Sequence, residues 1–433
     1  MTENGYVIHA LRTIAGPLIR TLSARALYPM AMVWRTLLFR TTFIAVTGSV
    51  GKTTAKECLA AILSSRFPTA KTSLNQNDGY GVPRTILRVR PWHRFAVVEV
   101  GIDSATLMKR SARLVQPHVA VILNVARTHK TKLTTLDQHA EAKSLFLRKL
   151  RPGGVAVLNA DDRRVAALAD SSKFSIRTFG TSPSFDFWAD NVSARWPRRL
   201  KFQVHSGSAS QAIRTRLVGT HWLTSALAAI AAAHYCGMPL PEAAEALSRV
   251  EPFPGRMLPV QLPNGAVFLR DDYNASIAAL EPALRVLEEA AAVRRWLVIQ
   301  DFSDFGKNRV HRLRFLASVA WRVADNVVIV GEHSAYGWRQ AIKAGLRPEH
   351  AHCFEAIQQA AQFLKGELTQ GDVVLLKGRT TDHVTRIFFA QLGPIQCWKK
   401  HCTKRIICDF CSELGAKEED LRKTLAIRPP VDD

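Results

Sequence analysis

A glycine-rich turn near the start of the chain has the residue types that hold nucleotide phosphates. It follows an apolar, β-branched run and opens a stretch with helical character. Glycines let backbone N–H groups approach a phosphate closely, a lysine can reach the outer phosphate oxygens, and a threonine hydroxyl can bind Mg²⁺. The turn is a short form of this motif, because Val46 stands where an earlier glycine is usual. The residues expected to bind a nucleotide are Gly48, Ser49, Gly51, Lys52, Thr53 and Thr54.

Polar residues also stand at the ends of the next apolar runs. Glu99 lies at the end of the run 95–100, and Asn124 ends the run 119–124, with His129 five residues later. Lys143 lies in a helical stretch, and an Asn-Ala-Asp-Asp sequence begins at Asn159. A carboxylate and an imidazole at neighbouring strand ends can hold Mg²⁺ directly or through water. Taken singly, these residues also fit a helix-capping carboxylate, a loop histidine and a solvated lysine.

Residues 43–190 alternate between strand-like and helical segments, and these elements must position the polar residues. This alternation predicts a doubly wound α/β domain with its ligand site at the carboxyl ends of the strands. Its predicted strands are 95–100, 119–124 and 154–159, and its predicted helices are 52–65, 104–114, 137–150 and 161–169. A small antiparallel patch is then expected at 200–204 and 212–218, followed by helices at 226–233 and 243–250.

A hinge rich in proline and glycine at 252–255 predicts a domain boundary, after which the alternation resumes. The second set has predicted strands at 266–269, 296–299, 326–330 and 372–376, and predicted helices at 277–292, 308–322, 334–344 and 355–367. The expected domains are a basic amphipathic extension at 1–41, a central ATP-binding domain at 42–252, a Rossmann-like C-terminal domain at 253–394, and a cysteine-rich basic tail at 395–433.

From about Phe43 to Phe389, the order of the motifs resembles the Mur ligase family of ATP-dependent, amide-forming enzymes. Within that family it is most similar to the ligases that add D-alanyl-D-alanine. The segments that carry the resemblance are 47–54, 75–77, 81–83, 99–101, 124–129, Lys143, 158–162, 255–257, 271–275, 301–306, His311 and 376–379.

The resemblance implies a role for each matching residue. Lys52 would bind the terminal phosphates of ATP, and two Mg²⁺ ions would be held by Thr53, Glu99, His129 and Lys143. Lys143 stands where the family carries a lysine carboxylated by CO₂, and the resulting anion can bind the second ion. The implied catalytic residues are Lys52, His129, Lys143 and Arg256, and the further nucleotide contacts are Asn159, Asp161, Arg256, Asp271 and Asn274.

The chain also departs from the family pattern. Only about forty residues precede Phe43, too few for the separate domain that holds the UDP-sugar in the peptidoglycan enzymes. Trp222 and Ser225 replace two asparagines, and Ser276-Ile277 replaces an Asn-Pro pair. These departures leave the phosphate and metal chemistry in place and predict a substrate other than a standard UDP-muramyl peptide.

The predicted function is that of an ADP-forming ligase that joins a carboxylate to an amine through an acyl phosphate. The acceptor could be a cell-wall precursor, a polyglutamate-like chain or a dedicated metabolite. Two alternatives stay open, namely a kinase or other phosphate-loop NTPase, and a non-catalytic nucleotide-binding partner of another synthase. The NTPase alternative leaves Lys143 and the motifs at 255–256 and 271–275 unexplained.

The chain is strongly basic, with a formal net charge of +23. No known nucleic-acid-binding signature accompanies this charge, so an anionic small substrate or an anionic membrane surface is the expected partner instead. Residues 6–40 are apolar but interrupted by arginines, without the roughly 20 continuous apolar residues that span a bilayer. This segment is expected either to pack on the next domain or to lie on a membrane as a basic amphipathic helix. No signal peptide is expected.

The cysteines are few and are patterned only in the last forty residues, which fits a reducing cytoplasm. There, four thiols could bind a structural Zn²⁺ as a closed tetrahedral site. Free or redox-active thiols and an iron–sulfur cluster are the alternatives, because the spacing differs from that of common zinc ribbons. The predicted ligands are Cys397, Cys402, Cys408 and Cys411.

Overall fold

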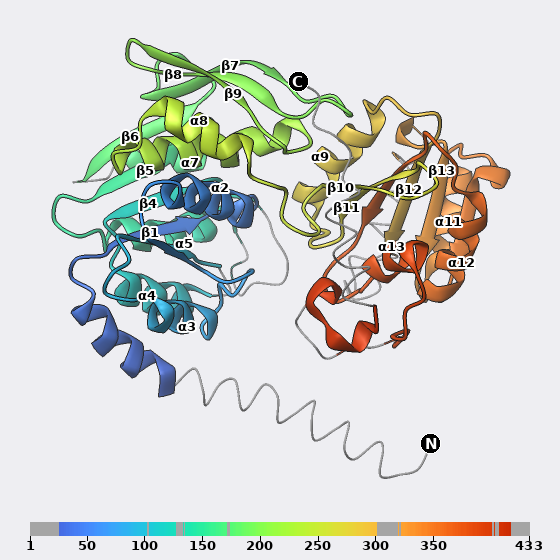
Figure 1. The fold of residues 1–433 in the computed structure, drawn as a ribbon, viewed down its shortest axis with the longest axis horizontal. Coiled ribbons are helices and arrows are strands. Elements are labelled where there is room, and N and C mark those ends of the chain that lie inside the picture. Colours follow the sequence, from blue (N-terminus) through green and yellow to red (C-terminus); the bar gives the residue numbers. More distant parts are fainter. Residues whose placement is uncertain are drawn as a thin grey trace. The chain divides into compact units, whose positions relative to one another are not determined.

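A computed structural model describes residues 26–101, 104–126, 133, 135–170, 174–300, 319, 322–400, 402 and 407–416. It divides into two compact units, drawn from blue to green and from yellow to red in Figure 1. The first unit ends at Val250 and the second begins at Glu251, while the short pieces Ser193–Leu200 and Arg216–Thr220 belong to the second unit. The predicted change of domain at 252–253 lies next to this change of unit.

The first unit is built on a sheet of nine strands, counted over the described residues. In spatial order these are β2 (Thr69–Lys71), β3 (Phe95–Glu99), β1 (Thr42–Thr47), β4 (Val119–Ile122), β5 (Val155–Asn159), β6 (Ser175–Gly180), β7 (Phe187–Ser193), β8 (Lys201–Ser206) and β9 (Ala209–Arg214). The pairs from β2 to β7 are parallel, and β8 and β9 form an antiparallel hairpin. The central strands β3, β4 and β5 are buried along their whole length and are apolar except for Glu99 and Asn159 at two of their ends, because helices cover both of their faces.

Helices cover this sheet in two layers. One layer contains α2 (Lys52–Ser64), α7 (Leu223–Tyr235) and α8 (Leu240–Ser248), and the other contains α3 (Gly81–Arg88), α4 (Ala105–Val115), α5 (Leu136–Leu147) and α6 (Arg163–Asp170). The run of alanines in α7 is buried on every side, which lets α7 lie close against α2. The predicted doubly wound α/β fold is therefore confirmed, and the predicted antiparallel patch is the β8–β9 hairpin.

The helix over residues 26–37 packs on the first unit. Packing on the next domain was one of the two expectations from the sequence for this segment. Ala31 and Leu38 are buried in the core of this unit. The Trp34 indole donates to Val89 O at 2.9 Å, and the buried Arg35 donates to Val115 O at 3.0 Å. The Arg35 guanidinium also lies 3.8 Å from the centre of the Phe43 ring. No helix in the described part of the chain is long and apolar enough to cross a bilayer.

The second unit has a six-stranded sheet within the described residues. Its spatial order is β10 (Leu258–Gln261), β11 (Val267–Asp271), β15 (Val373–Lys377), β12 (Arg295–Gln300), β13 (Asn326–Val330) and β14 (Ala351–Phe354), with only β10 antiparallel to its neighbour. Its helices include α9 (Ile277–Glu288), α11 (Ser334–Lys343), α12 (Ile357–Glu367) and α13 (Thr385–Leu392). The four predicted strands are confirmed, whereas most of the predicted helix at 308–322 lies outside the described residues.

The segment after α13 forms part of the core of the second unit. Cys408 and Leu414, from the short helices η4 (Cys408–Phe410) and η5 (Ser412–Leu414), are buried with strand and helix side chains of this unit. The fully buried Arg270 of β11 donates to both carboxylate oxygens of Asp409, at 2.7 and 2.9 Å, and to Asp272 at 3.2 Å. A buried cation needs paired anions, so this contact fastens the segment to the sheet.

We expect Asp409→Ala to destabilise the protein by roughly 2 kcal/mol, because Arg270 would keep only one of its two carboxylate partners in a buried setting. Denaturant unfolding followed by tryptophan fluorescence measures this change. Glu355→Ala is the matched control, since Glu355 and its partner Lys400 are both well exposed and lie 3.0 Å apart. The control should change stability by less than about 0.5 kcal/mol. Equal effects of the two substitutions would contradict the prediction.

Candidate active site

The phosphate loop links the end of β1 to the start of α2. Gly51 occupies the N-cap position with a φ of 84°, a left-handed conformation that glycine adopts without strain. A Cβ at this position would also lie 2.6 Å from Ser225 Oγ. No side chain caps α2, and its first turn holds no acidic residue. The first N–H groups of the helix are thus left for an anion, as in known phosphate-binding turns.

Asn124, at the end of β4, holds the loop in shape. Its side-chain oxygen accepts from the backbone N–H groups of Ser49 and Val50, each at 2.9 Å. Its amide nitrogen donates to Val50 O at 3.1 Å. Ser49 is bound from a second side, because its hydroxyl donates to Ala126 O at 2.8 Å and accepts from the N–H of Ala126. The loop conformation is therefore fixed before any ligand arrives.

Lys52 folds back over the same loop. Its ammonium donates to Gly48 O at 2.8 Å and to Ser49 O at 3.1 Å. These carbonyl contacts satisfy the charge while keeping it beside the N-terminus of α2. A phosphate bound in the turn can take over this ammonium with little movement of the side chain.

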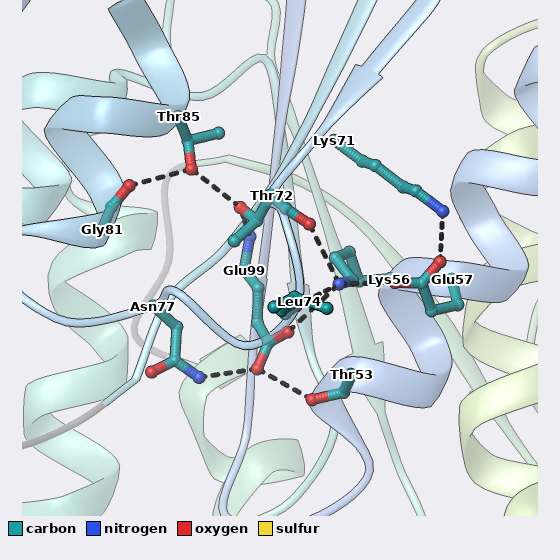
Figure 2. A network of polar contacts seen from close by, with 10 residues as sticks. All are labelled: Thr53, Lys56, Glu57, Lys71, Thr72, Leu74, Asn77, Gly81, Thr85 and Glu99. Atoms are coloured by element: carbon teal, nitrogen blue, oxygen red, sulfur yellow. Dashed lines mark hydrogen bonds and ion pairs between the residues drawn. The ribbon is translucent and has the colours of Figure 1, made fainter. Parts of the chain in front are cut away.

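Glu99, at the end of β3, faces the first turn of α2 (Figure 2). Its Oε1 accepts from Thr53 Oγ1 at 3.1 Å and from Asn77 Nδ2 at 2.6 Å, and the whole side chain is buried. Its Oε2 is buried without a hydrogen-bond partner, and the Lys56 ammonium lies 3.8 Å away. A carboxylate oxygen held in this state, next to a threonine hydroxyl, is the donor set that Mg²⁺ uses beside nucleotide phosphates.

Lys56 is a site residue that the sequence-based prediction missed. It is fully buried and donates to Thr72 O at 3.0 Å and Leu74 O at 2.6 Å, while the Glu57 carboxylate lies 2.7 Å away. The available signal was its spacing, because a residue three positions after Thr53 lies on the same face of a helix. Its ammonium balances the buried Glu99.

Lys143 reaches the phosphate loop from α5. It is fully buried, and its ammonium lies 3.4 Å from Ser49 Oγ. Burial lowers the pKa of this lysine from 10.5 to about 7, with a further lowering by the nearby Lys52 and an opposing effect of Asp162. About half of these amines are therefore neutral at pH 7, and the neutral amine is the nucleophilic form of a lysine.

The polar residues at and after the end of β5 form hydrogen bonds mainly with other residues of the first unit. Asn159 donates to Leu123 O at 2.8 Å and so joins the ends of β5 and β4. The Asp161 carboxylate accepts from the backbone and hydroxyl of Thr181, at 3.0 and 3.1 Å. Asp162, which the prediction did not include among the site residues, accepts from the N–H of Val125 at 2.7 Å. Its negative charge raises the pKa of Lys143 and so opposes the effect of burial.

His129 lies outside the described residues, so its predicted place at a metal site stays a prediction. Within the described part of the chain, no group of three or more His, Cys, Asp or Glu side chains is arranged to hold a metal ion. A Mg²⁺ ion bound beside ATP takes most of its ligands from phosphates and water, with one or two from the protein. The pair of Thr53 and Glu99 fits that requirement.

The predicted site residues of the second unit have partners within that unit. The Arg256 guanidinium stacks on the Tyr273 ring at 4.4 Å, and its Nε is buried without a hydrogen-bond partner. Asp271 forms an ion pair with the buried Lys377, whose pKa is lowered mainly by burial. Asn274 Oδ1 accepts from the N–H of Ser276 at 3.1 Å.

The four predicted zinc ligands come together in the second unit. Cys397, Cys402, Cys408 and Cys411 line one cavity of about 10 Å³, a space for a single water-sized centre. His383 also lines it, with Nδ1 3.2 Å from Cys408 Sγ. Burial raises the pKa of the Cys408 thiol to about 12, so this thiol is protonated as it stands.

The buried Lys143 gives a prediction for stability. The native state releases the proton of this lysine near pH 7, whereas the unfolded chain keeps it up to about pH 10.5. Between these values the unfolded state binds more protons, so stability rises with pH. We expect Lys143→Met to be the more stable protein at pH 6, by on the order of a few kcal/mol, and this advantage to shrink toward pH 10.

The measurement is the denaturant midpoint of each protein at pH 6 and pH 9.5 in CO₂-free buffer. Lys365→Met is the matched control, because this lysine is exposed on α12 and should give the same small difference at both pH values. A difference between Lys143→Met and the parent protein that does not depend on pH would contradict the prediction.

Comparison with known proteins gives consistent results. The model of the Mur ligase middle domain matches residues 46–233, and that of the Mur ligase glutamate ligase domain matches residues 255–380. The UDP-N-acetylmuramoyl-tripeptide–D-alanyl-D-alanine ligase of Escherichia coli is 32% identical over 266 residues, which are 61% of this chain and 58% of that protein. The chain thus spans somewhat more than half the length of that relative.

Solved structures show the same architecture. A crystal structure of MurF from Acinetobacter baumannii superposes with a TM-score of 0.77 at 28% identity, covering 84% of this chain and 79% of that one. MurF ligase from Thermotoga maritima, crystallised in complex with ADP, superposes with a TM-score of 0.73 at 20% identity, covering 85% and 83%, respectively. The two domain models together match most of the chain, and the chain belongs to the Mur ligase family.

Proposed function

We propose that the protein is an ATP-dependent, ADP-forming ligase that joins a carboxylate to an amine through an acyl phosphate, in the cytoplasm. The observation that carries this proposal is the buried Lys143 amine, 3.4 Å from Ser49 of the phosphate loop. An enzyme that only hydrolyses or transfers phosphate gains nothing from a second buried lysine in a site that already contains Lys52. A ligase gains from it once the amine is converted to an anion that binds metal.

The environment of Lys143 favours this conversion. A neutral amine attacks CO₂, a nitrogen–carbon bond forms, and the ammonium proton leaves to solvent, which yields a carbamate anion. The low pKa supplies the neutral amine near pH 7. The new negative charge would lie beside Lys52, so the repulsion between the two ammonium groups becomes an attraction. The carbamate oxygens, with His129, would hold a second Mg²⁺.

Thr53 and Glu99 are the residues that would hold the first Mg²⁺. Their oxygens are 3.1 Å apart, and the second oxygen of Glu99 has no hydrogen-bond partner. When bound, Mg²⁺ supplies positive charge between the ATP phosphates and the incoming carboxylate, two anions that otherwise repel each other. Lys56 then keeps Glu99 from carrying a net charge into the core.

The chain's own residues would act on ATP in sequence. The N–H groups at the start of α2 hold the phosphates, and Lys52 leaves its carbonyl partners for the terminal phosphate. A substrate carboxylate oxygen attacks the γ-phosphorus while the bond to ADP breaks. An amine then attacks the acyl carbon, phosphate leaves, and the amine proton passes to solvent.

Residues of the second unit would complete the nucleotide site. Arg256, whose Nε has no hydrogen-bond partner, would reach the ATP phosphates, and Asp271 and Asn274 would lie near the nucleoside. Asn159 and Asp161 support this site from the first unit through their backbone contacts.

Trapping of the acyl phosphate tests the proposal. The protein is incubated with ATP, Mg²⁺, hydroxylamine and a panel of carboxylates that includes a UDP-muramyl tripeptide and a γ-glutamate oligomer. We expect one member to give a hydroxamate together with one ADP, and Lys52→Ala to give neither. ADP release without hydroxamate would identify a kinase or NTPase. ATP binding without turnover would identify a non-catalytic partner, and either result would overturn the proposal.

Lys143 has a separate test. Lys143→Ala should lower the rate at least 100-fold, and a short carboxylic acid in the buffer should restore part of it by standing in for the carbamate. Lys149→Ala, which changes an exposed lysine just after the same helix, should keep full activity and show no effect of the acid. Absence of rescue, with ATP still bound normally, would remove the carbamate from the mechanism.

We further propose that the cavity lined by Cys397, Cys402, Cys408 and Cys411 binds one structural Zn²⁺. The support is that four thiols from separated positions line one small cavity. Their side chains as they stand are not arranged around a metal ion, so binding would require the thiols to turn toward one point. Zinc would deprotonate Cys408 despite its raised pKa, since metal coordination outweighs the effect of burial on a thiol.

Metal analysis of the purified protein tests the zinc proposal. We expect close to one zinc per chain, with loss of the metal and lowered thermal stability in Cys397→Ser. Cys236→Ser, which changes a thiol outside the cavity, should keep the full metal content. Iron in place of zinc, or a metal content near zero in protein purified without chelators, would overturn it.

A further inference from the structure

Exposed apolar side chains gather at one edge of the first unit. The helix over residues 26–37 buries Ala31 and Arg35, with Leu38 buried just after it, and leaves the opposite side to solvent. Met30, Val33 and Leu37 are 59, 66 and 57% exposed, and their spacing of three and four residues places them along one helical stripe. An isolated exposed apolar residue needs no explanation, whereas a continuous stripe of them marks an interaction surface.

The stripe continues beyond the helix. Phe39 is 70% exposed, and Trp92, in the turn before β3, is 69% exposed. Two hydrogen bonds tie the two ends of that turn to the helix and to the residue before β1, from Trp34 Nε1 to Val89 O at 2.9 Å and from Thr41 Oγ1 to His93 O at 2.8 Å. We refer to Met30, Val33, Leu37, Phe39 and Trp92 as the apolar edge.

The charged residues around the apolar edge all have the same sign. Residues 26–41, 81–94 and 104–116 contain no aspartate or glutamate. These segments are tied together, since Arg35 donates to Val115 O and Gln116 O, and the Tyr28 hydroxyl donates to Arg110 O. Their exposed cations are Arg40, Arg88, Arg90, Arg94, Lys109, Arg110 and Arg113.

This surface lies at the far end of the sheet from the phosphate loop. The helix over residues 26–37 leads into Thr42, the first residue of β1, while the loop follows Thr47, the last residue of that strand. Val115 and Gln116 likewise precede β4, whose other end is followed by Asn124. A large object bound to the apolar edge therefore leaves the nucleotide site of this unit open.

We propose that the apolar edge and its ring of cations bind the surface of an anionic lipid bilayer. A bilayer interface accepts an apolar stripe lying in its plane, takes up tryptophan at the headgroup level and attracts lysine and arginine. The charge complementarity decides for this partner, because the segments packed against the helix carry exposed cations and no acidic residue, which matches an anionic headgroup layer. The described part of the helix, residues 26–37, extends over about 18 Å, a length that can lie in the plane of a bilayer.

Vesicle co-sedimentation of the full chain tests the proposal without ATP or substrate. The probes are vesicles of equal parts phosphatidylglycerol and phosphatidylcholine, and vesicles of phosphatidylcholine alone. We expect binding to the anionic vesicles at least 10-fold tighter than to the neutral ones, and a strong decrease at 0.5 M salt. Similar binding to both compositions, or binding to neither, would overturn the proposal.

Substitutions then separate the apolar and the electrostatic contributions. Val33→Glu with Leu37→Glu should weaken binding to anionic vesicles at least 10-fold, and Arg88→Gln with Arg113→Gln should weaken it and reduce its dependence on salt. Val293→Glu is the matched control, because Val293 is a valine 74% exposed in the second unit. Unchanged thermal midpoints of all variants establish that they are folded.

Other partners of this surface are distinguished in the same experiments. If the Val33→Glu, Leu37→Glu protein binds vesicles like the parent protein but loses self-association in ultracentrifugation, the surface is a contact between copies. If the parent protein binds a single-stranded RNA and ignores anionic vesicles, the cations serve nucleic acid. Both results would overturn the membrane proposal and leave the ligase proposal unaffected.

Discussion

The phosphate loop depends on gathering buried positive charge before any phosphate is present. The half-buried Lys52 and the fully buried Lys143 both contact the phosphate loop, and the fully buried Lys56 lies one turn into α2, where the helix itself adds a partial positive charge. Burying ammonium groups is costly, and the structure offsets the cost with backbone carbonyls for Lys52 and Lys56 and with Glu99 as counter-charge. Lys143 receives the least compensation, which is why burial lowers its pKa so far and makes its amine reactive.

The parallel sheet brings the charged and polar groups of the site together. Because β1, β3, β4 and β5 run in the same direction, their carboxyl ends bring the loop, Glu99, Asn124 and Asn159 to one edge. Each of these polar groups has a hydrogen bond to a neighbouring strand end or loop. These contacts hold the site of the first unit in place, and the carbonyl contacts of Lys52 are the ones that a bound phosphate would replace.

Local patterns were enough to predict the central strands of both sheets, because each rests on a few adjacent residues with a strong preference, whereas the short strands β2, β10 and β14 were not predicted. The same patterns put the glycine-rich turn and Glu99 at strand ends, where the structure has them. The burial of Lys143 has no local signal, and only the family resemblance pointed to it. Lys56 and Asp162 were missed as site residues because their importance comes from what lies across the sheet. The link between Arg270 and Asp409 spans 139 residues, and no sequence pattern announces such a pair.

The chain has a net charge of +23, and the cations of the first unit act in two different ways. The lysines at the phosphate loop are buried or half-buried, so solution ions screen them little and they act on ligands within a few ångströms. The arginines around the apolar edge are exposed, so their attraction for anions extends about a Debye length and fades with salt. Composition alone does not distinguish these two groups of cations. The difference in burial distinguishes them. Raising the ionic strength should therefore weaken binding at the exposed surface far more than nucleotide binding.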